Sequence, residues 1–342
     1  MSKFSRIQFV LFGIFLLLAL PARAQNYSDG GWTGWQQPES APAGDYITNV
    51  PSARYLNNEF GMRYWFTTGS LSYNVSKPKI SSLDYKEDNS QSEEVYFRMA
   101  SRNERYLIKG YLGIGNTANG NLDDSDYENG RKISDTNSDL GDGRLQHVYL
   151  DLGYKLNSLS TSESTTSAIV GAGYFQDVMN ARGLTCKQAS SGSLAGICNS
   201  AGENLLSDNI KVIQNDARFT ALRVGLENNW SPSQRVTWRN EIALVPFAQF
   251  RDNDNHYLRS DLGTNGPNFR DNGMAVGTQL ETVFEYRFAP AWSLDFGGRY
   301  WIFWAPQTST KVGNTPFVLG KENSYDWLYQ RLGGYVGLAY HF

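Results

Sequence analysis

Long apolar segments are nearly absent from this 342-residue chain, and the only one stands at its start. Phe9–Leu20 is an apolar run of twelve residues that follows Lys3 and Arg6. It precedes Ala22-Arg23-Ala24, a small-x-small cleavage pattern. A membrane-spanning helix needs about 20 apolar residues, so we expect residues 1–24 to be a removable signal peptide. The remaining chain has no such run, and the mean hydropathy is -0.46, which excludes helical membrane spans.

The chain has no excess of basic charge, and histidine and cysteine are scarce. The formal net charge is -3, with three histidines and two cysteines. No basic stripe occurs, so we expect no nucleic-acid partner. Cys186 and Cys198 lie twelve residues apart in a polar stretch rich in Gly and Ser. In an exported chain this predicts a disulfide that closes a loop, with two free thiols as the alternative. No histidine lies near the pair, and we expect no metal site.

Aromatic residues and glycine are, by contrast, abundant. Aromatic residues make up 14% of the chain, and there are 33 glycines. An exported chain that is polar on average yet rich in both suits a transmembrane β-barrel, because alternating strands dilute their own hydropathy. A secreted soluble β-protein could share this composition, so the order of residues along the chain has to decide.

The residues after about position 57 contain ten segments in which side chains alternate with the period of a β-strand. In the clearest segment, Val148, Leu150 and Leu152 alternate with Tyr149 and Asp151. An apolar face opposite a polar or small face is what a barrel closed in lipid requires. The segments are Phe60–Val75, Glu94–Arg102, Tyr106–Gly115, His147–Tyr154, Ser167–Gln176, Arg218–Asn228, Arg235–Phe250, Val276–Tyr286, Trp292–Trp304 and Leu332–Phe342.

The connections between these segments alternate in length. The short connections cover residues 102–105, 157–166, 229–234 and 289–291, and the long ones cover residues 76–93, 116–143, 177–217, 251–274 and 305–330. Short periplasmic turns and long outer loops are the known asymmetry of outer-membrane barrels. A soluble β-sandwich has no reason to alternate in this way.

These patterns predict an all-β fold over residues 58–342, a ten-stranded antiparallel transmembrane β-barrel with long extracellular loops and short periplasmic turns. Residues 25–57 show no clear period and are expected to form an irregular N-terminal leader. The terminal Phe342, preceded by alternating aromatic residues, is typical of assembled outer-membrane barrels. The expected location is the cell outer membrane of a Gram-negative bacterium.

One histidine lies in an acidic segment at the upper end of the seventh predicted strand. In an extended chain, residues two apart point to the same side, so Asp252, Asp254 and His256 are expected to share one face. A carboxylate beside an imidazole fixes its tautomer and raises its basicity, as a general base requires. His147 and His341 are interpreted as strand residues with structural hydrogen bonds.

A second acidic cluster follows the third predicted strand, where Asp124 and Asp126 are expected to share one side. Two close carboxylates repel each other, so one tends to hold a proton or to share a water. By the order of the strands, both clusters emerge at the outer rim, which suggests a hydrolytic site that uses activated water. The alternative is that such Asp/Asn-rich loops are only solvated or bind calcium. The chain has no nucleophile elbow, and Gly113-Ile114-Gly115 is not a phosphate loop.

Several segments resemble the omptins, a family of ten-stranded outer-membrane endoproteases of Gram-negative bacteria. Ser82–Lys86 is similar to the early Leu-Asp-Trp-Lys strand of the family, and Gly120–Tyr127 to its Gly-Asn-x-x-Asp-x-Asp-Trp segment. Ile133–Asp135 and the strand Leu145–Leu156 follow the next part of the family pattern. Asp252–Tyr257 is similar to the family's Asp-Asn-Asp-x-His-Tyr. The resemblance spans most of the expected barrel.

The resemblance implies a role for each residue of the two clusters. Asp124 and Asp126 would form the carboxylate couple. His256 would deprotonate a water, and Asp254 would orient the imidazole. Asp252 matches a carboxylate that helps to bind a basic side chain of the substrate.

The resemblance also implies partners and a supporting residue. Asp135 is similar to an acid that supports the catalytic groups from behind. Family members use an acidic residue of the first outer loop for the substrate pocket, whereas the equivalent Ser76-Lys77-Pro78-Lys79 is basic and shorter. They also need lipopolysaccharide for activity, but no other cofactor. The implied partners are outer-membrane lipid, lipopolysaccharide, and a peptide or protein substrate at the cell surface.

We therefore expect a surface-facing endoprotease that cleaves peptides with water activated at an Asp/Asp plus Asp/His site. The first alternative is a non-enzymatic barrel of the same fold, an adhesin or a structural surface protein. The second is a small diffusion pore. Ten strands lie near the narrow end of barrel sizes, where side chains usually fill the lumen.

Overall fold

The computed structural model describes residues 58–259, 267–313 and 322–342. The expected signal peptide, residues 1–24, and the expected leader, residues 25–57, lie outside the described residues. No helix in the described part is long and apolar enough to cross a membrane.

The described residues form eleven antiparallel strands in one sheet, together with two short 3-10 helices. The strands are β1 (Glu59–Val75), β2 (Ser81–Ala100), β3 (Tyr106–Glu128), β4 (Arg131–Leu140), β5 (Arg144–Lys155), β6 (Ser164–Cys186), β7 (Asn204–Ser233), β8 (Val236–His256), β9 (Phe269–Ala289), β10 (Trp292–Val312) and β11 (Glu322–His341). The 3-10 helices are η1 (Asn157–Leu159) and η2 (Gly192–Leu194).

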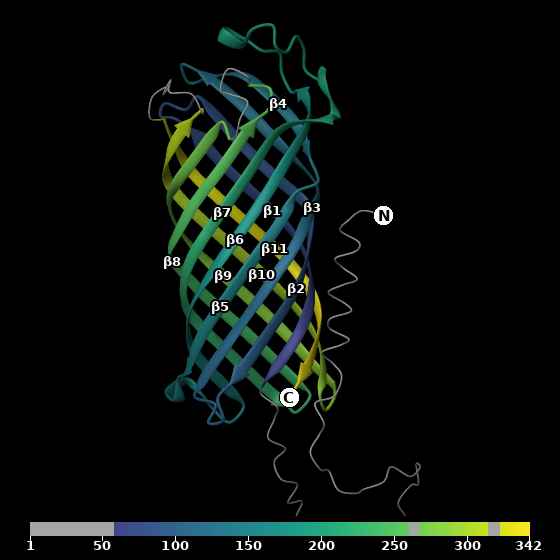
Figure 1. The fold of residues 1–342 in the computed structure, drawn as a ribbon, viewed down its shortest axis with the longest axis vertical. Coiled ribbons are helices and arrows are strands. Elements are labelled where there is room, and N and C mark those ends of the chain that lie inside the picture. Colours follow the sequence, from purple (N-terminus) through teal and green to yellow (C-terminus); the bar gives the residue numbers. More distant parts are fainter. Residues whose placement is uncertain (1–57, 260–266, 314–321) are drawn as a thin grey trace, which may run out of the picture. The chain divides into compact units, whose positions relative to one another are not determined.

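Pairing of the first strand with the last closes the sheet into a barrel of tilted strands (Figure 1). β1 pairs with β11 on one side and with β2 on the other. β4 and β5 both lie between β3 and β6, one beyond the other along the barrel. They together occupy the place of the fourth expected strand, so the all-β antiparallel barrel is confirmed.

The alternation that predicted the strands is the alternation between the outside and the inside of the barrel. In β5, Val148, Leu150 and Leu152 are exposed, whereas Tyr149 and Asp151 between them are buried. Exposed large apolar side chains recur in the same way on β7, β8, β9 and β10. An apolar belt around a sheet without free edges is the structure that lipid requires. The fold therefore places the chain in the outer membrane of a Gram-negative bacterium.

The strands extend well beyond the belt at the outer end, which the sequence did not predict. The expected loop at residues 116–143 is largely the hairpin of β3 and β4, with its turn at residues 129–130. β7 and β8 also run through residues expected to be loops, 204–217 and 251–256. Above the lipid a strand can be polar on both faces, so its alternation of apolar and polar residues disappears. The connections at the other end are short, as expected, for example residues 290–291 between β9 and β10.

Side chains fill the barrel at the level of the belt. The ring of Trp301 packs against the rings of Trp65 and Phe175, with centroid distances of 5.0 and 5.2 Å. His147 joins this cluster, and its Nε2 lies 2.8 Å from Oε1 of Glu94. A structural hydrogen bond of this kind is what the sequence predicted for His147.

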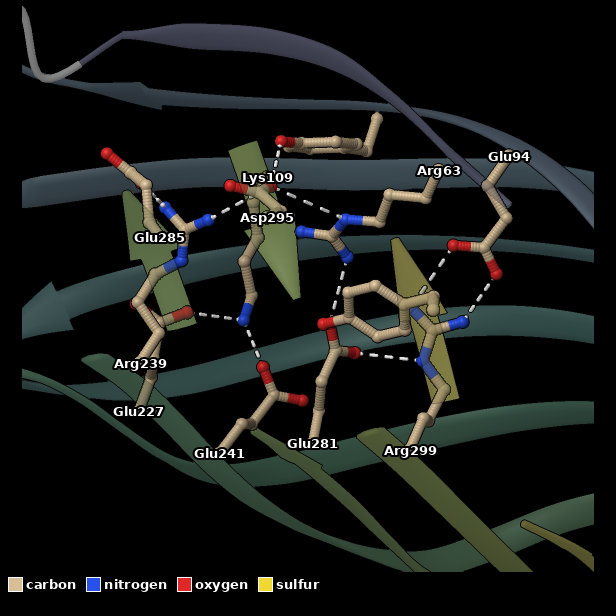
Figure 2. A network of polar contacts seen from close by, with 12 residues as sticks. Arg63, Glu94, Lys109, Glu227, Arg239, Glu241, Glu281, Glu285, Asp295 and Arg299 are labelled. Carbon is tan, nitrogen blue, oxygen red and sulfur yellow. Dashed lines mark hydrogen bonds and ion pairs between the residues drawn. The ribbon is translucent and has the colours of Figure 1, made fainter. Parts of the chain in front are cut away.

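A network of buried ion pairs occupies the next part of the lumen (Figure 2). The guanidinium of Arg299 donates to Glu94 at 2.6 Å and to Glu281 at 2.9 Å. Arg239 similarly bridges Glu59 and Glu285 at 2.7 and 3.0 Å. Buried charges are tolerated when each has an opposite partner and hydrogen bonds. The lumen at this level is thus packed with paired charges.

Candidate functional site

A cavity of about 410 Å³ lies at the outer end of the barrel, beyond the lipid belt. Asp124, Asp126, Asp254 and His256 all line it, and they come from β3 and β8. The structure therefore brings together the two clusters that the sequence singled out, although they are far apart in the chain.

Regular pairing of β8 with both neighbours positions its acidic end. Asp252 and Asp254 pair with β7 and with β9, so the strand stays extended to His256. Side chains two apart then share a face, and Asp252 and Asp254 both point inward with only 1% of their surface exposed. The predicted common face of these residues is confirmed.

His256 is held from several directions. Its Nε2 lies 3.2 Å from Oδ2 of Asp254, and its backbone N–H donates to the side chain of Asn268 at 2.6 Å. The ring packs edge-on against Phe269, with centroids 5.0 Å apart. Burial is the largest single effect and would lower the pKa of His256, but the carboxylates of Asp254 and Asp124 together outweigh it and raise the pKa above the ordinary value. The imidazole thus has the orientation and basicity of a general base.

Asp254 is fixed in turn by Tyr73, which the sequence analysis did not identify. The Tyr73 hydroxyl donates to Oδ2 of Asp254 at 2.6 Å, the same oxygen that faces His256. The Tyr73 ring stacks on Trp327 with centroids 3.6 Å apart and an interplanar angle of 8°. This stack restricts the hydroxyl, and through it the carboxylate. The alternation of β1 points Tyr73 inward and could have revealed it.

A register shift between β2 and β3 turns the side chains of Asp124 and Asp126 towards the cavity. The register of β2 and β3 shifts on both sides of Asn89. Before the shift, Lys109 of β3 points into the lumen, where it binds Glu227 at 2.5 Å. After it, the even-numbered side chains of β3 point inward, and Asp124 and Asp126 line the cavity. Without the shift, alternation would have carried the odd-numbered side chains of β3 into the cavity instead.

The two carboxyl groups of the couple favour holding a proton. Burial and the adjacent Asp126 raise the pKa of Asp124 to about 7, although His256 acts in the opposite direction. Burial also raises the pKa of Asp126, again opposed by His256. Ser81 contributes a long hydrogen bond, 3.4 Å, to Asp124. The couple can therefore present both a proton donor and an acceptor near neutral pH.

Asp252 lies behind the cavity rather than in its wall. It accepts a hydrogen bond from Asn215 at 3.0 Å and is not among the described residues that line the cavity. Burial, followed by the nearby Asp254 and Asp271, raises its pKa well above the ordinary value. Asp252 thus lies close to the catalytic candidate Asp254, but it does not face the cavity.

Asp271 is a further cavity residue that the sequence analysis missed. It faces Asp252 across the β8–β9 pair and lines the cavity. Thr308 and Thr310 donate to it at 2.7 and 2.5 Å. Burial, despite these hydrogen bonds, raises its pKa to about 6. Only the strand register, which the sequence did not supply, brings Asp271 to the site.

Asp135 on β4 supports the couple from outside the cavity. Its carboxylate accepts from Ser125 at 3.1 Å and from Lys132 at 2.9 Å. Ser125 stands between Asp124 and Asp126 on β3, so this contact fixes the backbone that carries them. The supporting role that the resemblance implied for Asp135 stays a prediction.

The expected disulfide is present. Cys186 and Cys198 are bonded, with their Cα atoms 5.9 Å apart. The loop that they close includes η2 and belongs to the connection between β6 and β7. Two of its residues, Leu194 and Ile197, line the cavity.

One group of potential metal ligands occurs in the described part of the chain, at the opposite end from the cavity. It consists of Glu59, Glu285 and His341. The guanidinium of Arg239 donates to both carboxylates, and Ser293 lies 2.8 Å from Nε2 of His341. A cation therefore already stands where a metal would bind.

The barrel is similar to solved outer-membrane proteins. The outer membrane protease OmpT from Escherichia coli is 15% identical, with a TM-score of 0.66, over 84% of this chain and 98% of that one. The outer membrane protein OprG from Pseudomonas aeruginosa is 11% identical, with a TM-score of 0.34, over 83% and 97%. No family model and no curated protein sequence matches the chain. The similarity to OmpT shows a shared barrel fold.

Proposed function

We propose that this barrel is a surface-facing endoprotease that cleaves peptides with a water activated at its outer mouth. The observation that carries the proposal is the shared cavity, because Asp124 and Asp126 of β3 line it together with Asp254 and His256 of β8. A general base and a proton-holding carboxyl couple beside one space are the groups that hydrolysis by water requires.

The proposed mechanism assigns one task to each group. His256, oriented by Asp254, takes a proton from a water as its oxygen attacks the carbonyl carbon of a peptide bond. The proton held by Asp124 and Asp126 stabilises the oxygen that becomes negative in the tetrahedral intermediate. His256 then returns the proton to the leaving nitrogen as the carbon–nitrogen bond breaks. No covalent intermediate with the protein forms.

Two further observations support the proposal. The acidic segments resemble those of the omptins, and the fold is similar to that of OmpT, a protein described as an outer membrane protease. Burial also raises the pKa values of three carboxyl groups gathered in this region, those of Asp124, Asp252 and Asp271. Perturbed carboxyl groups gathered at a cavity are characteristic of functional sites.

The packed lumen weighs against a pore. Trp65, Trp301 and Phe175 and the ion pairs of Figure 2 fill the barrel at the level of the lipid belt. A non-enzymatic surface barrel stays as the alternative, and peptide cleavage distinguishes the two.

The experiment is a peptide-library digest with purified barrel supplemented with lipopolysaccharide. We expect the wild type to cleave and His256→Ala to be inactive. Asp142→Ala is the matched control, because its carboxylate is 79% exposed and lies outside the cavity lining. Folding of each variant is checked by the heat-dependent shift of its gel mobility. A folded wild type that leaves the whole library intact would contradict the proposal.

A further inference from the structure

The lining of the cavity combines the carboxyl groups and His256 with aliphatic side chains. One set of aliphatic side chains, which we call the aliphatic wall, comes from β6, β7 and the outer connections β6–β7 and β8–β9. These are Leu184, Leu194, Ile197, Val212, Ile213 and Leu258. Other strands and the β1–β2 connection add Val75, Ile80, Leu83 and Val312 to the apolar part of the lining. A volume of about 410 Å³ is within the range of pockets that bury a small ligand or a few side chains.

We infer that this aliphatic wall binds an apolar side chain of the substrate next to the bond that is cut, and that Leu194 and Ile197 of the disulfide-closed loop determine this specificity. The inference rests on the proposed function and adds the class of substrate. The occupant is the side chain of a Leu, Ile, Met or Phe residue in an extended peptide.

Exposed aliphatic surface at the rim points to an apolar occupant. Ile197 is 48% exposed and Leu258 is 51% exposed, yet both lie at the outer end of the barrel, away from the lipid belt. Exposed apolar side chains that border a cavity commonly mark a binding site. These two line the same cavity as the buried Val212 and Ile213, so an apolar side chain that enters from the rim can find apolar contacts deeper in the cavity.

The loop that carries Leu194 and Ile197 is built to stay in place. Cys186 ends β6 and is bonded to Cys198, directly after Ile197. The backbone N–H of Ser191 donates to the carbonyl of Ile133 on β4 at 2.9 Å. Ser190 similarly donates to the carbonyl of Cys198 at 2.9 Å. A loop fixed before binding loses little conformational entropy when a substrate arrives. In Figure 1 the connection between β6 and β7 lies at the end of the barrel where β4 is labelled.

Four carboxyl groups of the described residues line the cavity, those of Asp124, Asp126, Asp254 and Asp271, but they are already engaged. Asp254 accepts a hydrogen bond from Tyr73 and faces His256, and the raised pKa values of Asp124 and Asp126 favour a shared proton. Asp252 is 1% exposed and is not among the described residues that line the cavity. Asp271 already accepts hydrogen bonds from two threonines. Arg259 itself lines the cavity.

The first outer turn adds two more cations at this end of the barrel. The ammonium of Lys79 lies over the ring of Tyr127 at 4.0 Å, and that of Lys77 over Tyr325 at 4.1 Å. A lysine or arginine of the substrate would approach cations and enter an aliphatic wall. Burying a charge without an opposite partner is costly.

The test is a digest of peptides that differ only at the two residues flanking the cut bond, with wild type, Ile197→Asp and Leu159→Asp. Leu159 is the matched control, since it ends η1 at the opposite end of the barrel and is 56% exposed. We expect the wild type to prefer apolar residues. Ile197→Asp should lower kcat/KM for those peptides about tenfold, mainly through KM, since one apolar contact in a pocket gives roughly that discrimination. It should also increase cleavage beside lysine, while Leu159→Asp matches the wild type.

The outcomes separate the inference from the proposed function. Cleavage by the wild type that prefers lysine or arginine on both sides of the bond would overturn the inference alone. Equal kinetics of Ile197→Asp and Leu159→Asp would do the same. Absence of any cleavage by folded wild type would overturn the proposed function and the inference with it. A second measurement uses the intact wild type treated with a thiol reductant. Reduction should weaken the preference for apolar residues while cleavage that depends on His256 continues, and an unchanged preference would contradict the role of the loop.

Discussion

The lumen at the lipid belt and the outer mouth treat buried charge in opposite ways. In the lumen, Glu94 and Glu281 are each bonded to Arg299. At the mouth, Asp252 is buried beside Asp254 and Asp271. Burial raises the pKa of Asp252, and these two neighbouring carboxylates raise it further. The first arrangement neutralises charge and holds the strands together. The second places carboxyl groups where their charged form is disfavoured, which lowers the stability of the fold. Such an arrangement is typical of functional sites.

The largest expected effect comes from breaking the hydrogen-bond chain at the mouth. Asp254→Asn keeps the shape of the side chain but removes the charge that orients His256 and raises its pKa. We expect kcat to fall about 10³- to 10⁴-fold, as when a carboxylate behind a catalytic histidine becomes an amide. Steady-state cleavage of one peptide measures the loss. The supporting Tyr73→Phe should lose much less, about tenfold.

Breaking the ion-pair network in the lumen should instead lower the free energy of unfolding. Arg299→Ala leaves Glu94 and Glu281 buried without their cation, which typically lowers the free energy of unfolding by about 3–5 kcal/mol. The midpoint of urea unfolding measures this, and Arg102→Ala, in an exposed turn, is the control. An Arg299→Ala midpoint equal to that of the control would show that the lumen network does not stabilise the barrel.

The mouth should also make stability depend on pH. The folded-state pKa of Asp124 is raised to about 7, and that of Asp271 to about 6, from 3.8. The folded barrel therefore binds more protons than the unfolded chain between about pH 4 and 7, and its stability falls as the pH rises through this range. The raised pKa of His256 acts with the same sign. We expect a lower urea midpoint at pH 8 than at pH 5, and a smaller difference in Asp124→Asn. A midpoint that rises with pH would contradict this account.

The smallest effect, but the sharpest comparison, comes from one isosteric change in each region. Asp252→Asn removes a carboxyl group whose charged form is disfavoured by burial and by Asp254 and Asp271, and should raise the free energy of unfolding at pH 8 by about 1 kcal/mol or less. Glu94→Gln removes a negative charge that pairs with Arg299 and His147, and should lower it. Equal signs for the two variants would remove the distinction between the regions.

The same division explains what the sequence could predict. Strand positions such as that of β5 followed from alternation, because lipid enforces an apolar outer face on residues such as Leu150. Above the belt no such rule operates, so the outer parts of β3 and β7 were expected to be loops. The common face of Asp254 and His256 was predictable, since it needs only an extended chain.

Contacts between distant strands were not predictable. The approach of Asp271 depends on the β8–β9 register, and that of Tyr73 on a barrel closed between β1 and β11. The inward orientation of Asp124 depends on the register shift at Asn89. The resemblance to the omptins marked Asp124 and His256 as partners, and the fold supplied the cavity that they share. Single-sequence patterns carry local periodicity but not which strands meet.

The most direct test of the central claim is a double-mutant cycle on kcat/KM for one cleaved peptide, with Asp124→Asn, His256→Ala and the double variant. If the two residues act on the same water, removing either one should eliminate most of the catalysis. The double variant should then be about as slow as the slower single variant. Losses that multiply in the double variant, or single variants as active as the wild type, would contradict a shared hydrolytic site at the mouth of the barrel.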